Sequence, residues 1–367
     1  MPNGPQQSHR PPLPLSYRQE IVPTIMRCIQ AGDSCALIGA PQTGKTNLLR
    51  FLCRQDVQAK YLGSDAHRSL LVLVDANQAP DLSHWRNYIP FLEGLRGATK
   101  NLKDNIDSLA PYPADFGDTS RADSREGHRR LKDFLKELCE TRDLKVVFLI
   151  DQFDRPFQEL EDDFFITLRG FRDALEGDCK YKLCYVVTLC EAPGAIRLEF
   201  DTRCKPFHDL LAENVYGLKP YKSPDARLMI QRLVHPRGIA MPDEQHLQDF
   251  LWLAGGHGGL LRALFDVWRT GQWPITGDMV DELLTHPSVR GQCDKLWESL
   301  SREEKDMIGL IAREQDWPEL DKDVVLYLRT KGLVNWPPGI PRANVFSPLF
   351  RVYAKHQLTL VPQLSRG

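Results

Sequence analysis

Short apolar runs alternate with helical segments through the first half of the chain. Four runs are apolar almost throughout, and they lie at residues 35–38, 69–74, 145–150 and 183–189. A strand without a polar face is covered on both sides, which is typical of a parallel sheet between two layers of helices. Helices are predicted between the strands at residues 44–55, 125–141 and 157–175. The pattern predicts an α/β domain over residues 17–217, with a parallel sheet and helices on both faces.

The strand pattern ends after Pro220, and the rest of the chain has helical periodicity. Amphipathic segments lie at residues 223–235, 243–254, 258–270 and 277–285. They predict a small helical lid domain over residues 218–297. Two further helices, at 301–313 and 320–330, precede a proline-rich turn at 337–341. Helices followed by a short hairpin predict a winged-helix domain and tail over residues 298–367.

Two segments lack a clear pattern. Residues 1–16 are rich in proline, which predicts an extended, disordered tail. Residues 80–124 are rich in proline, glycine, asparagine and aspartate, and their apolar periodicity is weak. This second segment is predicted to be an insertion or a flexible loop of the α/β domain.

The composition excludes several classes of protein. The 367 residues are 42% hydrophobic and 26% charged, which is typical of folded globular domains. The net charge is only -2, so a global basic field for nucleic acid or anionic membranes is absent. The nine cysteines include no Cys-x-x-Cys pair, and no apolar run has the length of a membrane span. We therefore expect a cytoplasmic protein with reduced thiols and no membrane partner.

The most specific motif is GAPQTGKT, which fits the phosphate-binding pattern G-x-x-x-x-G-K-[ST]. An apolar strand precedes it and a helical pattern follows, so backbone N–H groups and a helix N-terminus would face the phosphates of ATP or ADP. Lys45 would neutralise the β- and γ-phosphates, and the Thr46 hydroxyl would bind Mg²⁺. The predicted nucleotide-binding residues are Gly39, Ala40, Pro41, Gln42, Thr43, Gly44, Lys45 and Thr46.

A second motif supports the first. The apolar strand at 145–150 ends in Asp151, which in a Walker B arrangement would hold Mg²⁺ together with Thr46. The next residue is Gln152, which orients water but accepts no proton, and Asp154 is the remaining carboxylate. Both are candidate catalytic residues. Slow hydrolysis is expected if neither position supplies a well-placed base.

The order of these motifs resembles that of the STAND and AAA-like P-loop ATPases over about residues 17–356. The residues Tyr17, Arg18, Gln19 and Glu20 resemble the segment that those proteins fold over the adenine. Thr188 lies where the family has its sensor 1, and residues 215–221 resemble the link to the lid. The stretch at 253–262 is similar to the GxP-type lid motif, with Gly258 in the place of proline, and residues 346–350 resemble the end of a winged helix.

The resemblance implies two further functional residues. Arg262 would act as a sensor 2 arginine, although an arginine on an amphipathic helix is often a solvated surface residue. Arg203 would reach the γ-phosphate of a neighbouring subunit in trans; alternatively, it pairs on the surface with Asp201 or Asp209.

Three functions fit these motifs. The first is a STAND-like conformational switch that self-associates on binding ATP and acts on a protein partner carrying a sensor or effector. The alternative is a DNA-associated AAA+ ATPase of the replication-initiator or transposition-regulator type. Residues 298–356 contain nine Lys and Arg and nine Asp and Glu, so the predicted winged helix is neutral and weak nucleic-acid binding at most is expected. The third is a domain that binds nucleotide without turnover.

Overall fold

The computed structural model describes residues 10–78, 86–99, 124–196, 205–274, 278–316, 321–340 and 342–359. The chain divides into two compact units. One contains residues Gln19–Ile38 and Lys45–Tyr216, and we call it the sheet unit. The other contains residues Met1–Arg18, Gly39–Gly44 and Gly217–Gly367, and we call it the helical unit.

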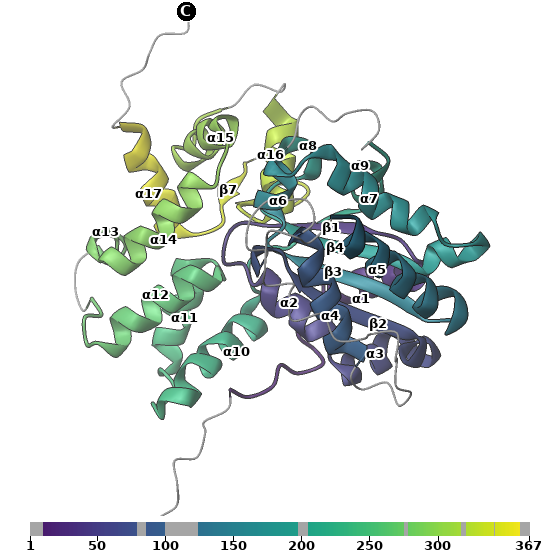
Figure 1. Ribbon diagram of the computed structural model, residues 1–367. Helices are drawn as coiled ribbons and strands as arrows, with labels where there is room; N and C mark the ends of the chain where they lie inside the picture. The colour runs from purple at the N-terminus through teal and green to yellow at the C-terminus, as the bar shows by residue number, and fades with distance from the viewer. Residues whose placement is uncertain are drawn as a thin grey trace, which may run out of the picture. The chain divides into compact units, whose positions relative to one another are not determined.

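The sheet unit is built on a five-stranded sheet within the described residues, in the order β2-β3-β4-β1-β5 (Figure 1). Its strands are β1 (Cys35–Ile38), β2 (Ser69–Asp75), β3 (Lys145–Asp151), β4 (Leu183–Leu189) and β5 (Val215–Gly217). The pairs β1–β4, β2–β3 and β3–β4 are parallel, and β1 and β4 are buried throughout. The predicted α/β fold with a parallel sheet is therefore confirmed.

The topology brings the ends of three strands together. β4 lies between β1, which leads into the phosphate-binding motif, and β3, which ends in Asp151. Because parallel strands place their carboxyl ends at one edge of the sheet, the residues that follow β1, β3 and β4 share that edge.

Helices cover the sheet and are amphipathic. They are α1 (Val22–Ala31), α2 (Lys45–Leu52), α3 (Gln55–Leu62), α4 (Ile89–Thr99), α5 (Ser124–Lys136), α6 (Asp154–Glu159), α7 (Asp162–Asp173), α8 (Pro193–Ile196) and α9 (Lys205–Ala212). A π-helical turn, Glu137–Thr141, continues α5. The single helix predicted at 157–175 is wrong, because Leu160 and Glu161 are extended and separate α6 from α7. The sequence did not predict this break because the apolar residues have helical spacing both before and after it.

Part of the segment predicted as an insertion or flexible loop is a packed helix. Residues 86–88 form a 3₁₀ turn, α4 follows, and Phe91, Leu92 and Leu95 are buried. A Cβ atom at Gly94 would lie 2.8 Å from the Leu73 carbonyl oxygen of β2, so the glycine lets the helix approach the strand. The rest of that segment, residues 80–85 and 100–123, lies outside the described residues.

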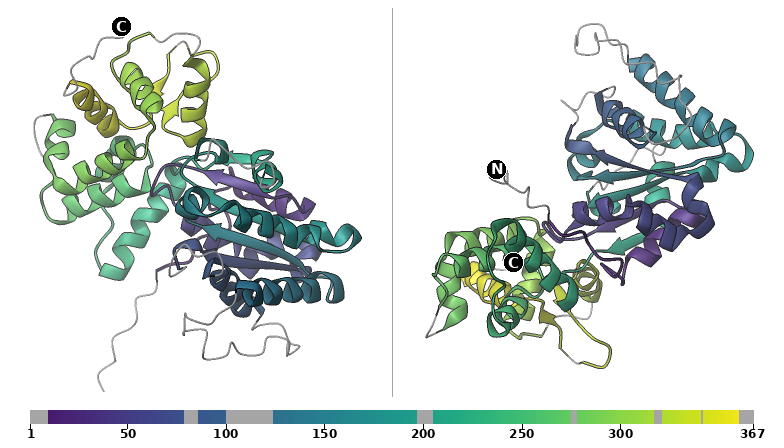
Figure 2. Two further views of the ribbon diagram at one scale, coloured as in Figure 1. Left: turned by 45° about the horizontal axis from the view of Figure 1, so that its top comes forward. Right: turned by 90° about the horizontal axis from the view of Figure 1, so that it is seen from below.

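The helical unit contains most of the C-terminal half of the chain (Figure 2). Its helices are α10 (Ser223–Val234), α11 (Glu244–Ala254), α12 (Gly258–Arg269), α13 (Met279–Thr285), α14 (Pro287–Glu298), α15 (Arg302–Ala312), α16 (Lys322–Lys331) and α17 (Pro348–Thr359). The pattern predicted all but α14 and α17. Throughout the described ranges, no helix combines the length and the apolar character needed to cross a membrane.

A short antiparallel hairpin follows α16. It pairs β6 (Val334–Asn335) with β7 (Asn344–Val345). The order helix, helix, hairpin is the one expected for residues 298–367, and α17 then begins within the segment predicted to end the winged helix. Assignment of this part as a winged helix, and the predicted domain boundaries, remain proposals.

The proline-rich N-terminal segment is not wholly a free tail. Residues 1–9 lie outside the described residues. Within residues 10–16, however, Leu13 is buried and the Pro11 carbonyl accepts a hydrogen bond from Arg232 of α10. The prediction of a disordered tail is therefore wrong for residues 10–16, because the Leu13 side chain is buried and the Pro11 carbonyl has a partner in α10.

Candidate nucleotide site

The loop Gly39–Gly44 has the backbone of an anion-binding turn. Gln42 and Gly44 have positive φ angles of 62° and 94°. The Thr43 hydroxyl donates to the Ala40 carbonyl at 2.9 Å, which closes the turn. Within the described part of the chain, the backbone N–H groups of Gln42 and Gly44 donate to no protein acceptor. These two donors are available to phosphate oxygens.

The carbonyl side of the same loop is held by buried side chains. His257 Nε2 lies 2.7 Å from the Pro41 carbonyl oxygen, and Arg18 donates to the Thr43 carbonyl at 2.5 Å. Arg18 is fully buried and His257 is 1% exposed. The family resemblance implies that the segment with Arg18 folds over the adenine, which stays a prediction; within the helical unit the Arg18 guanidinium contacts the phosphate loop.

Tyr221 packs beside the loop. A Cβ atom at Gly44 would lie 2.0 Å from the Tyr221 hydroxyl, so only glycine fits there. The Arg18 guanidinium lies 3.9 Å from the centre of the Tyr221 ring, and the hydroxyl groups of Tyr17 and Tyr221 are 3.4 Å apart. Burial raises the pKa of Tyr17, so its hydroxyl stays protonated at neutral pH.

The sheet unit supplies the cation of the motif. Lys45 and Thr46 form the first turn of α2, whose N-terminal backbone amides add positive potential. Lys45 Nζ donates to Cys190 Sγ at 3.5 Å. Cys190 follows β4 directly, so the lysine lies at the sheet edge where the strands end.

Asp151 is positioned by the end of β4. It is 3% exposed, and its Oδ1 accepts a 2.9 Å hydrogen bond from the Thr188 hydroxyl and a 3.1 Å bond from the Gln152 amide. Thr188 is fully buried. These bonds fix one carboxylate oxygen, and the second is directed to no hydroxyl or amide within the described residues.

The two candidate catalytic residues lie in different surroundings. Gln152 is exposed, has φ 57°, and accepts a 2.8 Å hydrogen bond from the Asn77 side chain. Asp154 begins α6, and its Oδ1 accepts from the Cys190 backbone N–H at 2.5 Å. This bond ties one carboxylate oxygen of Asp154 to the backbone that follows β4. The Gln152–Asn77 pair is the better placed group for orienting water.

Sequence reasoning missed one carboxylate at this edge. Asp75 ends β2 and stands in register with Asp151 of β3. Its Oδ1 accepts from the Asn77 amide at 3.1 Å. The signal was present, because the run at 69–74 ends in aspartate just as the run at 145–150 does.

Of the two arginines that the family resemblance implied, one is described. Arg262 is exposed on α12. It follows Gly258 by four residues and Gly259 by three, so the three share one helix face. Cβ atoms at these glycines would lie 2.7 Å from the Gln42 carbonyl oxygen and 2.5 Å from Gln42 Oε1. The face that carries Arg262 therefore borders the phosphate loop, whereas Arg203 lies outside the described residues.

These residues fit a magnesium nucleotide. The loop offers two amides without protein acceptors, and the peptide bond between Gly44 and Lys45 joins it to the helix N-terminus that carries Lys45 and Thr46. Thr46 and Asp151 provide the hydroxyl and carboxylate oxygens that Mg²⁺ prefers. ATP or ADP with Mg²⁺ thus matches the donor and acceptor groups present.

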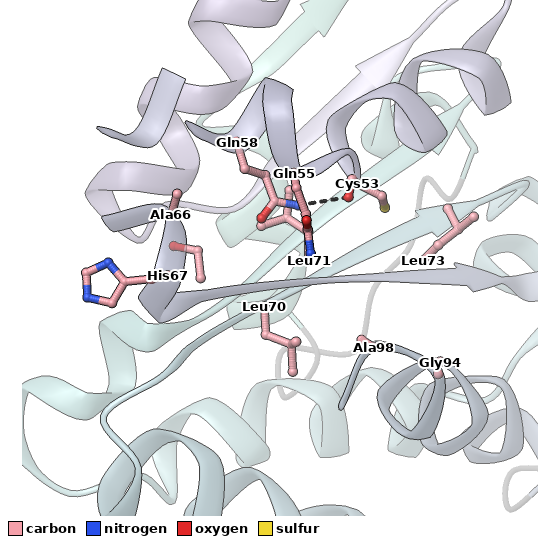
Figure 3. Close-up of a pocket in the computed structure, with 12 residues that line it drawn as sticks. Cys53, Gln55, Gln58, Ala66, His67, Leu70, Leu71, Leu73, Gly94 and Ala98 are labelled. Carbon is pink, nitrogen blue, oxygen red and sulfur yellow. Dashed lines mark hydrogen bonds between the residues drawn. The ribbon is translucent and has the colours of Figure 1, made fainter. Parts of the chain in front are cut away.

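A cavity lies elsewhere in the sheet unit. It has a volume of about 640 Å³ and is lined by β2, by α3 and by α4 near Leu71, Gln58 and Gly94 (Figure 3). Gln58 donates to the Cys53 carbonyl at 3.0 Å along its wall. No residue of the phosphate loop or of the Asp151 motif lines this cavity, so it is separate from the nucleotide site.

No family model and no curated protein matches the sequence. Solved structures do match the fold. The ORC2 protein of Aeropyrum pernix in its ADP form is 15% identical, with a TM-score of 0.51 over 97% of this chain and 98% of that chain. A Walker-type ATPase of Pyrococcus abyssi is 14% identical, with a TM-score of 0.52 over 92% and 95% of the two chains. The ADPNP–ADP form of ORC2 has 14% identity and a TM-score of 0.50 over 95% and 96%.

The likeness shows that this chain has the fold of P-loop ATPases of the AAA type, with a helical C-terminal part. It supports the AAA-like half of the resemblance and does not extend to the STAND proteins specifically. At these identities the likeness shows the fold alone, and the choice among the three functions remains a proposal. Magnesium, turnover and self-association remain proposals.

Proposed function

We propose that this chain is an ATP-dependent P-loop ATPase of low turnover, whose nucleotide state switches its association with DNA. The proposed association with DNA rests on the extent of the likeness to ORC2. It follows the alternative given by the sequence resemblance, a DNA-associated AAA+ ATPase of the replication-initiator type. The likeness covers 97% of this chain, and so includes the helical C-terminal part as well as the phosphate-binding fold. The nucleotide part rests on the loop amides, Lys45 and Asp151.

The proposed roles follow from the contacts. Lys45 and the loop amides hold the phosphates, and Thr46 and Asp151 hold Mg²⁺, with Thr188 fixing the carboxylate. Bound Mg²⁺ would neutralise charge on the phosphates. Gln152, supported by Asn77, orients the attacking water, and Asp154 holds the strand end through Cys190. Because no free carboxylate adjoins Asp151 in sequence, we propose slow hydrolysis.

The direct test combines binding and turnover. Calorimetric titration with ATP and ADP should give micromolar dissociation constants, and phosphate release should be slow and Mg²⁺-dependent. Asp151→Asn should abolish turnover while nucleotide still binds. Binding without phosphate release in the wild type would support the third function, a nucleotide-binding domain without turnover.

The Arg262 side chain is proposed as the lid residue that senses the γ-phosphate. We expect Arg262→Ala to weaken ATP binding about five- to tenfold and to leave ADP binding unchanged, because an exposed charge-assisted bond contributes roughly one kcal/mol. Arg269→Ala on the same helix is the control, since Arg269 pairs with Asp266 on the surface. Equal losses for ATP and ADP would contradict a sensing role.

DNA binding should be weak and only mildly dependent on salt. Residues 298–356 carry no net charge, and α16 exposes Lys322 beside Asp323. Fluorescence anisotropy with duplex DNA should give a slope of roughly −1 to −2 in log K against log salt, which corresponds to one or two phosphate contacts. The affinity should differ between ADP and a slowly hydrolysed ATP analogue.

A second candidate function is the nucleotide-driven assembly switch acting on a protein partner. The absence of net charge over residues 298–356 favours it, since a domain that reads DNA is usually basic. Absence of DNA binding at low salt in both nucleotide states, with ATP-dependent self-association in size-exclusion chromatography, would replace the DNA proposal by this one. Arg203→Ala would then test whether an arginine in trans supports turnover.

A further inference from the structure

Two carbonyl groups of the phosphate loop accept hydrogen bonds from residues far away in sequence. The Pro41 carbonyl accepts from His257, which is 216 positions away, and the Thr43 carbonyl accepts from Arg18, which is 25 positions away. Both side chains are almost fully buried. The sequence motif assigns neither residue a part in phosphate binding.

These carbonyls belong to the same peptide groups as the loop's two available amides. The Pro41 carbonyl shares a peptide group with the Gln42 N–H, and the Thr43 carbonyl shares one with the Gly44 N–H. A donor on a peptide oxygen polarises the group and makes its N–H a stronger donor. Arg18 and His257 therefore bond to the carbonyl ends of the two peptide dipoles whose N–H ends would face phosphate.

His257 is fixed by using both ring nitrogens. Its Nδ1 caps α12, with the Leu260 backbone N–H at 3.3 Å. Because a backbone N–H only donates, Nδ1 accepts, and in the neutral ring Nε2 then carries the hydrogen that is donated to Pro41. The helix cap thus selects the tautomer that bonds to the loop.

Arg18 is fixed by its own set of bonds. Its guanidinium also donates to the Lys219 carbonyl at 2.7 Å and stacks over Tyr221. Its backbone has φ 54°, an uncommon value for a residue other than glycine, and its N–H donates to Asp225 at 3.1 Å. These two hydrogen bonds and the ring contact hold Arg18 in one conformation, so its guanidinium group is fixed beside the loop.

We propose that Arg18 and His257 are positioning residues that set the phosphate affinity of the loop through the Thr43–Gly44 and Pro41–Gln42 peptide groups. The phosphates are then coupled to the N-terminal segment and to the start of α12 without direct contact. This inference rests on the proposed nucleotide binding, and it concerns how strongly the β-phosphate, rather than the nucleoside, is held.

The experiment compares ADP with AMP, which lacks the β-phosphate. The dissociation constants are measured by displacement of a fluorescent ADP analogue from the full chain. His257→Asn keeps an N-cap residue for α12 but is too short to reach the loop. Arg18→Gln removes the charged guanidinium group. Arg18→Lys keeps the positive charge but loses the guanidinium geometry. His246→Asn and Arg269→Gln, on the surface of the same unit, are the matched controls.

We expect the ratio of the AMP to the ADP dissociation constant to fall about tenfold in Arg18→Gln, because bonds from charged donors are the stronger ones. It should fall about threefold in His257→Asn, with Arg18→Lys intermediate and both controls unchanged. AMP affinity itself should change little. A loss shared equally by ADP and AMP would indicate a merely structural role and overturn the proposal.

Two outcomes separate the proposals. If the wild type binds no nucleotide, the proposed function fails. If the wild type prefers ADP and the variants keep the same ratio, only this inference fails. For a variant too unstable to titrate, the amide proton shifts of Gln42 and Gly44 in deuterated wild-type protein give a second measurement. Both should lie downfield before ADP is added, and random-coil values would contradict polarisation.

Discussion

Lys45→Ala should abolish measurable binding of ATP and ADP while the protein stays folded. Lys45 is half-buried in the first turn of α2, where its ammonium group donates to Cys190 Sγ. Its side chain is therefore not part of the apolar core. The loss of a cation beside two or three phosphate charges should weaken binding at least about a hundredfold.

Titration calorimetry measures this loss, and circular dichroism checks the fold. Arg50→Ala is the matched control, because Arg50 is exposed in the last turn of the same helix. It should bind nucleotide like the wild type. Equal affinity of Lys45→Ala and wild type would contradict the assignment of the phosphate loop.

The sheet could be predicted from sequence because its signal is local. The four predicted runs are mostly buried on both faces, so each is apolar along most of its length, and two of them match β1 and β4 to the residue. β5 was missed because it has only three residues and none is fully buried. Helix α4 was missed because Pro90, Gly94 and Gly97 interrupt its pattern, although Gly94 is required by the close approach to β2.

The site could be predicted only where its residues are close in sequence. The motif that ends in Thr46 and the strand that ends in Asp151 each carry their chemistry within eight residues. The contacts of Arg18 and His257 join segments that fold together only in the helical unit. No spacing rule predicts them, because they depend on tertiary packing.

The departure at Gly258 has a steric reason. The family pattern has proline there, and the sequence alone left the lid motif incomplete. In the helical unit a Cβ atom at Gly258 would lie 2.7 Å from the Gln42 carbonyl oxygen and 3.2 Å from Tyr221. Glycine at this position lets α12 approach the phosphate loop. The absence of proline is therefore compatible with a close contact between α12 and the loop.

Glu304→Ala should strongly destabilise the C-terminal part of the chain. Glu304 and Lys331 are 3% and 1% exposed, and their side chains form a 2.9 Å ion pair between α15 and α16. The other Glu304 oxygen accepts from the Ser301 amide at 2.9 Å in the capping box that begins α15. Loss of the carboxylate leaves a buried ammonium group, at a cost of about 3–5 kcal/mol, and also removes the cap.

Urea denaturation followed by circular dichroism measures the loss, and a double variant isolates its cause. In Glu304→Gln with Lys331→Met, the glutamine keeps the capping box and the methionine fills the space without charge. We expect the double variant to be much more stable than Glu304→Ala. A loss below about 1 kcal/mol in Glu304→Ala would mean that Lys331 reaches water. The result bears on DNA binding, because a lysine held in this pair has no charge to offer a phosphate, which leaves Lys322 and Arg329 as the other two cations of α16.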